Sequence, residues 1–250
     1  MDGDILSKSN VASQNGCLSE VGEFKPEIIK KKILDINEAA NVNCFNFMLS
    51  DEITDEQIEA EIISKIDPKK TVICAFTDSF FAQARVSRIA LKYRIPFIAG
   101  QHHEGGTVSE VVFWYPGVTK YSLREIARTR YEAFENGYVN TVTSVGSPIF
   151  NTTRINALCE KIAMGLLLYG QSKTHMYCSF VEAMCEKNLI LIKQAYLPPE
   201  HPLYVLFKNN PGSFFDDVVW LDPATIEDLE DVVLEEETVG DTREIFPKAQ

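Results

Sequence analysis

The strongest constraint on the fold is an alternation between short, β-branched apolar segments and helical segments. Residues 71–76 (TVICAF) and 95–99 have the composition of strands, and residues 79–93 between them carry apolar side chains at helical spacing. Parallel strands need a crossover connection, which is usually a helix. The pattern predicts an α/β fold with a Rossmann-like, mostly parallel sheet flanked by helices.

Other segments fit the same plan. Helices are expected over five further segments: residues 21–37, 51–66, 121–136, 151–169 and 174–187. Strands are expected at residues 41–48 and 71–76, and a longer strand of a different kind at residues 107–115. The strand at 71–76 should be buried on both faces. Thr54 is the expected N-cap of the second helix, because Gln57 follows three residues later.

The composition permits one large domain with an appendage. At 250 residues and 45% hydrophobic content, the chain can bury a sizeable core. We expect a main domain over residues 1–170 and an irregular C-terminal extension over residues 171–250, ending in an acidic tail. Ten Asp and Glu residues lie in 221–250, so the net charge of −12 belongs largely to the tail. An acidic balance argues against nucleic-acid binding.

The cysteines and the hydropathy favour a soluble protein of the cytoplasm. None of the six cysteines belongs to a CxxC pair, so reduced thiols are expected. No signal peptide opens the sequence. The longest apolar run, at residues 162–169, is about half of the roughly 20 residues that span a bilayer. We therefore expect no membrane partner.

The first candidate site residues lie near the start of the sequence. An acid at the end of a strand can hydrogen-bond both hydroxyls of a ribose, and Asp2 with Asn10 and Gln14 fits that role. The alternative is that Asp2 only forms a turn. Lys25, just inside the first predicted helix, could reach phosphates as a point charge, whereas a lone surface lysine is usually only solvated.

Asp78 is the next candidate. It follows the strand at 71–76 closely, and the carboxyl end of a parallel strand faces the ligand crevice. A carboxylate there can hold Mg²⁺ against a triphosphate. The alternative is that Asp78 or Ser79 only caps the helix that follows.

Residues 101–106 (QHHEGG) raise the question of a metal site. Adjacent residues on an extended segment point in opposite directions, so His102 and His103 should not share a ligand. Neither has a Cys or His partner at ligand spacing. We therefore expect no metal to bind here.

Taken in order, these segments resemble the ThiF/MoeB/HesA family, the adenylyltransferase domain of ubiquitin-activating-type enzymes. The family pattern runs from an acid through Ser-Asn-Leu-x-Arg-Gln, Gly-x-x-Lys, Asn-Pro and Thr-Asp-Asn to a Pro that opens a strand. The matching elements here, at nearly the family's separations, are Asp2, residues 9–14 (SNVASQ), 22–25 (GEFK), 36–37 (IN), 77–79 (TDS) and 95–96 (IP).

The resemblance implies a domain that binds ATP and Mg²⁺ and adenylates the C-terminal carboxylate of a ubiquitin-like or sulfur-carrier protein, working as a homo- or heterodimer. Carried over by position, Asp2 would bind the ribose, and Asn10 and Lys25 would bind the phosphates. Gln14 is expected among the residues that bind the nucleotide. Asp78 would hold the magnesium, and Lys25 and Asp78 are the expected catalytic residues. These roles are positioning and charge neutralisation.

Two departures from the family pattern affect the residues expected to bind the phosphates. No strand and glycine-rich loop precede Asp2, so we expect an N-terminally truncated domain that needs a missing segment for its phosphate cradle. The arginine expected before Gln14 is Ser13, for which Arg85 and Arg88 are candidate substitutes.

Two further departures concern cysteine. Residues 115–130 lack the zinc-binding cysteines of many relatives, so no zinc site is expected. Cys159 lies in an apolar helical segment and is interpreted as a small buried residue rather than a thioester nucleophile.

Two functions from different classes follow. The first is an adenylating enzyme of the ubiquitin-like-modifier-activating type. The second is a catalytically inactive dimer partner or scaffold, which the missing loop and Ser13 favour. An ordinary NAD-binding protein fits poorly, because the glycine fingerprint of that class is also absent.

Overall fold

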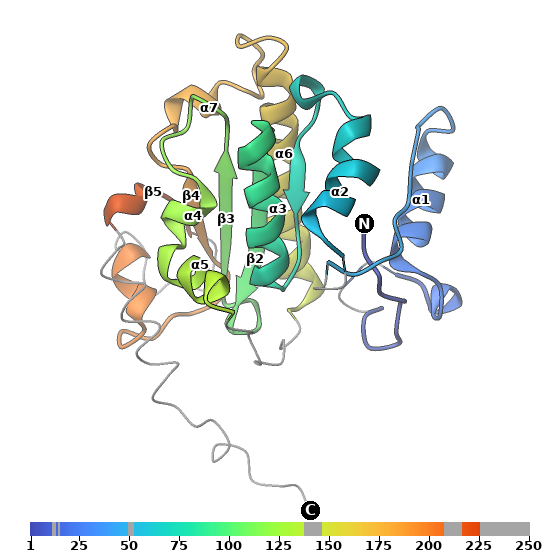
Figure 1. Cartoon of the computed structure of the whole chain (residues 1–250). Helices are drawn as coiled ribbons and strands as arrows, with labels where there is room; N and C mark the ends of the chain where they lie inside the picture. Colours follow the sequence, from blue (N-terminus) through green and yellow to red (C-terminus); the bar gives the residue numbers. More distant parts are fainter. Residues whose placement is uncertain (12–13, 15, 50–52, 138–146, 208–216, 226–250) are drawn as a thin grey trace, which may run out of the picture.

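A five-stranded sheet forms the centre of the molecule. The computed structural model describes residues 1–11, 14, 16–49, 53–137, 147–207 and 217–225. The strands follow one another across the sheet in chain order (Figure 1). They are β1 (Ile73–Ala75), β2 (Phe97–His103), β3 (Val108–Trp114), β4 (Leu189–Lys193) and β5 (Asp217–Leu221).

Helices cover both faces of the sheet, which confirms the α/β class. On one face lie α3 (Phe80–Tyr93), α4 (Leu123–Ile126) and α5 (Arg128–Glu135). On the other lie α6 (Ile149–Tyr169) and α7 (Phe180–Ala183). Alternate residues of each strand therefore enter two separate cores.

The strand pairing corrects the expectation of a mostly parallel sheet. Among the described strands, only β1 and β2 are parallel, with Ala75 opposite Ala99, and the other three pairs are antiparallel. The cause is the turn at Glu104–Gly106, where Gly105 and Gly106 have φ of 65° and 92°. A connection this short returns the chain alongside itself, whereas a parallel partner needs a crossover.

The C-terminal part also differs from the expected irregular extension. Strands β4 and β5 belong to it, and β4 is buried along its whole length between β3 and β5. Residues 171–225 therefore supply two strands of the sheet. The predicted acidic tail lies mostly outside the described residues.

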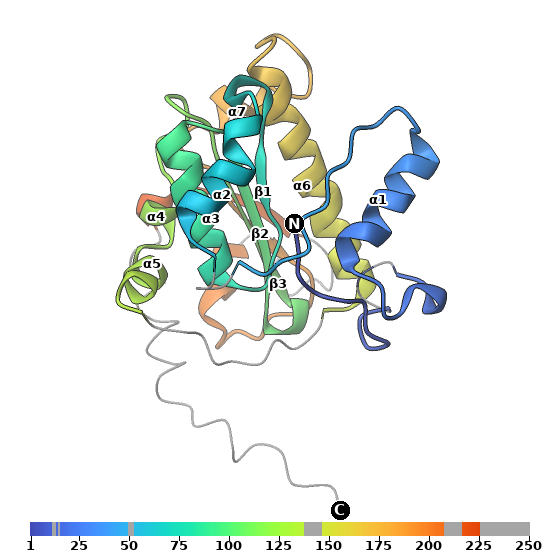
Figure 2. The same ribbon diagram turned by 45° about the vertical axis from the view of Figure 1, so that its right-hand side comes forward.

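The first two helices lie on the β1 side of the sheet, where the second of them packs against α3. The predicted helices at 21–37 and 51–66 appear as α1 (Lys25–Ile36) and the shorter α2 (Asp55–Glu61), followed by a 3₁₀ turn. Thr54 caps α2 in a capping box with Gln57, as predicted. In both views α1 stands apart from the sheet, and the N-terminus lies between α1 and β1 (Figure 2).

The N-terminal strands are not formed. The expected strand at 41–48 is extended chain without sheet pairing, and the segment before Leu6 makes one isolated bridge, Ile5 to Phe24. Strand β1 lies at the sheet edge and pairs only with β2 among the described residues. Cys74 and Phe76 are exposed, which corrects the expectation of a strand buried on both faces.

No helix within the described part of the chain is long and apolar enough to cross a membrane.

Candidate functional site

Asp2, the predicted ribose ligand, forms a turn. Its Oδ1 accepts a hydrogen bond from the backbone N–H of Asp4 at 2.9 Å. Its own N–H donates to the carbonyl of Phe45 at 3.1 Å. This geometry matches the turn-forming alternative, and it brings a second carboxylate, Asp4, to the same place.

Asp4 is the partner of the predicted phosphate ligand Lys25. The Lys25 ammonium lies 2.9 Å from Asp4 Oδ2, and the Lys25 N–H donates to the Asp4 carbonyl at 3.0 Å. The Lys25 side chain is 17% exposed and that of Asp4 54%. The sequence interpretation missed Asp4, although the Asp-Gly-Asp run already offered two carboxylates.

Asn10 and Gln14 share one turn. The Gln14 N–H donates to the Asn10 carbonyl at 2.9 Å, and Gln14 is exposed. Ser13, where the family carries arginine, lies outside the described residues. The turn therefore keeps Asn10 and Gln14 close to each other, within the segment that precedes α1.

Asp78 lies at the predicted place, after β1 and before α3. Ser79 is the N-cap of α3: its hydroxyl accepts from the Ala82 N–H at 3.3 Å, while its own N–H donates to the Thr77 hydroxyl at 3.2 Å. Asp78 is exposed, and no described residue bonds to its carboxylate. The capping role thus falls to Ser79, and the Asp78 carboxylate is available for a ligand.

The predicted residues are only partly brought together. Asn10 and Gln14 share a turn, but no contact between described residues joins Asp2 to Asp78 or Lys25 to Asp78. Lys25 instead bonds to Asp4.

The sequence interpretation did not predict that polar side chains cluster at the carboxyl end of β2. Glu110 of β3 accepts hydrogen bonds from Arg130 of α5, at 3.1 Å to each carboxylate oxygen, and from Gln101 at 3.2 Å. His103 Nε2 lies 3.5 Å from Glu110 Oε2. Burial opposes the charge on Glu110, but Arg130 and His103 together lower its pKa to about 2.

His102 points to the opposite face, as strand alternation predicts. Its Nδ1 lies 2.8 Å from the hydroxyl of buried Ser109, which accepts a hydrogen bond from the Gln194 amide. Burial and the neighbouring His103 lower the pKa of His102. Within the described ranges, no group of three or more His, Cys, Asp or Glu side chains is arranged to hold a metal.

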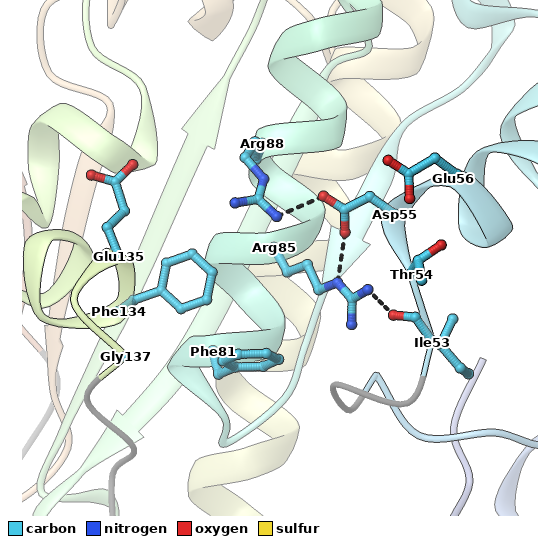
Figure 3. A pocket seen from close by; sticks show the side chains of 10 residues that line it. All are labelled: Ile53, Thr54, Asp55, Glu56, Phe81, Arg85, Arg88, Phe134, Glu135 and Gly137. Carbon is cyan, nitrogen blue, oxygen red and sulfur yellow. Dashed lines mark hydrogen bonds and ion pairs between the residues drawn. The ribbon is translucent and has the colours of Figure 1, made fainter.

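A cavity of about 460 Å³ opens between α2, α3 and α5 (Figure 3). Phe81 and Phe134 meet edge to face in its wall, with ring centroids 5.1 Å apart. Arg85 and Arg88 reach in from α3 and Asp55 from α2.

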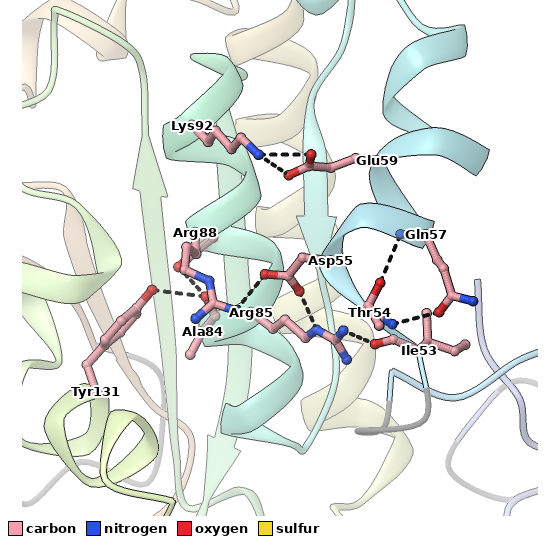
Figure 4. Close-up of polar contacts among 11 residues, drawn as sticks. Ile53, Thr54, Asp55, Gln57, Glu59, Ala84, Arg85, Arg88, Lys92 and Tyr131 are labelled. Atoms are coloured by element: carbon pink, nitrogen blue, oxygen red, sulfur yellow. Dashed lines mark hydrogen bonds and ion pairs between the residues drawn. The ribbon is translucent and has the colours of Figure 1, made fainter.

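Both arginines form ion pairs with Asp55 (Figure 4). Arg85 Nε donates to Asp55 Oδ1 at 2.7 Å, and Arg88 Nη2 donates to Oδ2 at 2.6 Å. Arg85 also donates to the Ile53 carbonyl. Partial burial opposes the charge on Asp55, but the two arginines lower its pKa. The candidate substitutes for the missing arginine therefore join α2 to α3.

Cys159 is buried, and burial, with smaller effects of Cys74 and Glu160, raises its pKa to about 12. The thiol is neutral near pH 7, which suits the predicted packing role and not a nucleophile.

The ThiF family model matches residues 1–175. No curated protein matches the chain. Among solved structures, PaaA has a TM-score of 0.53 at 16% identity, over 88% of this chain and 62% of PaaA.

MccB of E. coli has a TM-score of 0.51 at 13% identity, over 88% of this chain and 54% of MccB. A structure of E. coli MccB with ATP has a TM-score of 0.49 at 17% identity, over 68% and 47% of the two chains. The likeness to PaaA and to the first MccB structure shows a shared fold. The chain spans about half the length of MccB.

Proposed function

The chain belongs to the ThiF family, and from this premise we propose that it takes part in ATP-dependent adenylation of the C-terminal carboxylate of a ubiquitin-like or sulfur-carrier protein in the cytoplasm. The observation that carries the proposal is Asp78. Its carboxylate lies at the carboxyl end of a parallel strand, is exposed, and bonds to no described residue. An oxygen ligand of this kind suits Mg²⁺ held by a triphosphate.

The other residues would hold the nucleotide. Lys25 would meet a phosphate after exchanging its contact with Asp4, and Asn10 would bind phosphate from its turn. Asp2 and Gln14 would face the ribose. All these groups act by position and charge, and none forms a covalent bond.

We infer that the phosphate cradle of this site comes from polypeptide outside these 250 residues, as a strand and a glycine-rich turn beside β1. The outer edge of β1 pairs with no described strand, and Cys74 and Phe76 are exposed there. An edge with unpaired N–H and C=O groups is a template for a further strand. A helix N-terminus after such a turn would offer N–H groups to phosphate.

A second candidate function is that of a catalytically inactive partner in a dimer. The observation in its favour is the engagement of the cations: Lys25 is paired with Asp4, and Arg85 and Arg88 are paired with Asp55. A triphosphate would have to compete with these carboxylates. In this case the exposed edge of β1 is an interaction surface rather than part of a nucleotide site.

ATP–pyrophosphate exchange separates the two functions. The chain is assayed with candidate carrier proteins, both alone and extended by any in-frame polypeptide that precedes it. Adenylation predicts exchange that needs Mg²⁺ and the carrier's free C-terminal carboxylate, and that Asp78→Asn abolishes. Binding of a second ThiF-family chain without exchange in any form supports the partner role instead.

A further inference from the structure

Glu110 and His103 form a carboxylate–imidazole pair on neighbouring strands. His103 Nε2 lies 3.5 Å from Glu110 Oε2, while Gln101 Nε2 lies 3.2 Å from Oε1 and 3.3 Å from His103 Nε2. Two tautomers are compatible with these distances: a proton on Nε2 faces the Glu110 carboxylate, whereas a proton on Nδ1 leaves Nε2 to accept from the Gln101 amide. The Gln101 amide donates to Glu110 Oε1 in both, and the carboxylate charge favours the proton on Nε2. Nδ1 is left as the basic nitrogen, and no described residue bonds to it.

The two members of this pair differ in exposure. The Glu110 side chain is 12% exposed and is held by Arg130, whereas the His103 side chain is 37% exposed. A charged carboxylate beside a partly exposed imidazole orients the ring and favours one tautomer. The other nitrogen remains open to solvent or substrate.

The pair lies at the edge of the sheet that carries Asp78. Strands β1 and β2 are parallel, with Ala75 opposite Ala99, so the residues after β1 and the end of β2 share one edge. Arg130 connects the two places: it binds Glu110 at 3.1 Å, and its guanidinium lies 5.1 Å from the ring centre of Phe80, two residues after Asp78.

We propose that His103, oriented by Glu110, is the general base of a transfer step that follows adenylation. This inference rests on the proposed function, and its acceptor is a primary amine. The amine nitrogen attacks the acyl carbon of the acyl-adenylate, and the bond from that carbon to the phosphate oxygen breaks, so AMP leaves with the electron pair. His103 Nδ1 takes the proton from the attacking nitrogen and later releases it to water.

The acceptor class follows from the chemistry of the two steps. A carboxylate attacking ATP carries no proton to remove, so the first step has no use for a base. An attacking amine must lose a proton, and a positioned base typically contributes about 10²–10⁴-fold to such a step. In addition, Cys159 is buried with a raised pKa and does not offer an alternative thiol acceptor within α6.

The test measures two rates on the form of the protein that supports exchange. ATP–pyrophosphate exchange reports adenylation, and transfer of the carrier's acyl group to glycinamide reports the second step. We expect His103→Ala to keep exchange within about twofold and to reduce transfer by about 10²–10⁴-fold. Added imidazole should restore part of the transfer, and Glu110→Gln should also reduce it.

The control is His102→Gln on the opposite face of β2, which should leave both rates within about twofold, because its side chain points away from Glu110 and a Gln amide can keep a hydrogen bond to Ser109. Equal losses of exchange and transfer in His103→Ala, or transfer unchanged by it, overturn the base assignment while leaving adenylation intact. Absence of exchange in every form of the wild-type protein refutes the proposed function, and the base assignment with it.

The tautomer provides a readout that does not depend on activity. In ¹⁵N-labelled protein, the imidazole nitrogen shifts of His103, assigned by comparison with His103→Ala, should report a proton on Nε2, and Glu110→Gln should reduce that preference. A proton on Nδ1 in the wild-type protein contradicts the proposed orientation.

Discussion

Lys25 at the start of α1 and Asp4 near the N-terminus form an ion pair of 2.9 Å across 21 residues of sequence. The pair holds α1 to a segment that has no sheet pairing beyond one bridge. The same pair engages the Lys25 ammonium group, to which the resemblance to the family gives the role of binding phosphate. If Lys25 binds phosphate as proposed, stability and nucleotide binding depend on the same ammonium group.

Asp4→Asn separates these two roles. Asp4 is more than half exposed, so the substitution should lower the free energy of unfolding by no more than about 1 kcal/mol. Lys25→Met should have a similar effect on stability but should weaken ATP binding, which Asp4→Asn leaves intact or strengthens. Urea unfolding and nucleotide titration check both. Equal ATP affinity in Lys25→Met and in the wild-type protein would contradict a role of Lys25 in phosphate binding.

Asp78→Asn should change function without changing stability. The side chain is exposed and bonds to no described residue, so the free energy of unfolding should stay within about 0.5 kcal/mol of the wild-type value. Mg²⁺-dependent exchange should be lost. Ser79→Ala is the matched comparison: it removes the α3 cap and should cost about 1 kcal/mol. A destabilised Asp78→Asn protein would indicate a structural role.

Asp55→Ala should be strongly destabilising. Arg85 is 7% exposed in its side chain and would lose the carboxylate that pairs with its guanidinium. The expected loss is about 3 kcal/mol, measured by urea unfolding. Arg88→Gln is the control, because Arg88 is half exposed and its loss should cost less than about 1 kcal/mol. Similar losses in both variants would contradict a buried pair.

Acid should weaken the fold through Glu110. Its pKa is about 2 in the folded protein against an ordinary value of 4.5, so the folded state favours the charged carboxylate. The resulting stability, up to about 3 kcal/mol, is present above pH 4.5 and is lost as the pH falls towards 2. Glu110→Gln should flatten the pH dependence of stability in this window. An unchanged slope would show that Glu110 titrates normally.

The exposed edge of β1 should promote association. Cys74 and Phe76 are exposed beside unpaired backbone of an edge strand, so gel filtration should give species larger than a monomer whose size grows with concentration. Phe76→Lys places a charge beside this edge and should shift the protein towards the monomer, whereas Asn136→Lys at the C-cap of α5 should not. A concentration-independent monomer would contradict the prediction.

Several features follow from local sequence alone. The cap at Thr54, the helix after Asp78 and the position of Asp78 at the end of β1 are set by neighbouring residues, and the structure confirms them. The opposite directions of His102 and His103 follow from strand geometry in the same way. The motif order was also sufficient for the family, which the match over residues 1–175 confirms.

The pairings across long distances were decided by the tertiary structure. Strand direction after β2 depends on the backbone at Gly105 and Gly106, and whether β1 is covered depends on what packs beside it. Arg85 and Arg88 meet Asp55 from 30 and 33 residues away, and Glu110 meets Arg130 from 20. Hydrophobic periodicity and capping depend on residues within one or two helical turns. The ion-pair partner of a charged side chain depends instead on how the helices pack against the sheet and against each other. The sequence therefore predicts which residue types lie at the sheet edge. Which of them pair with other side chains is decided by the tertiary structure.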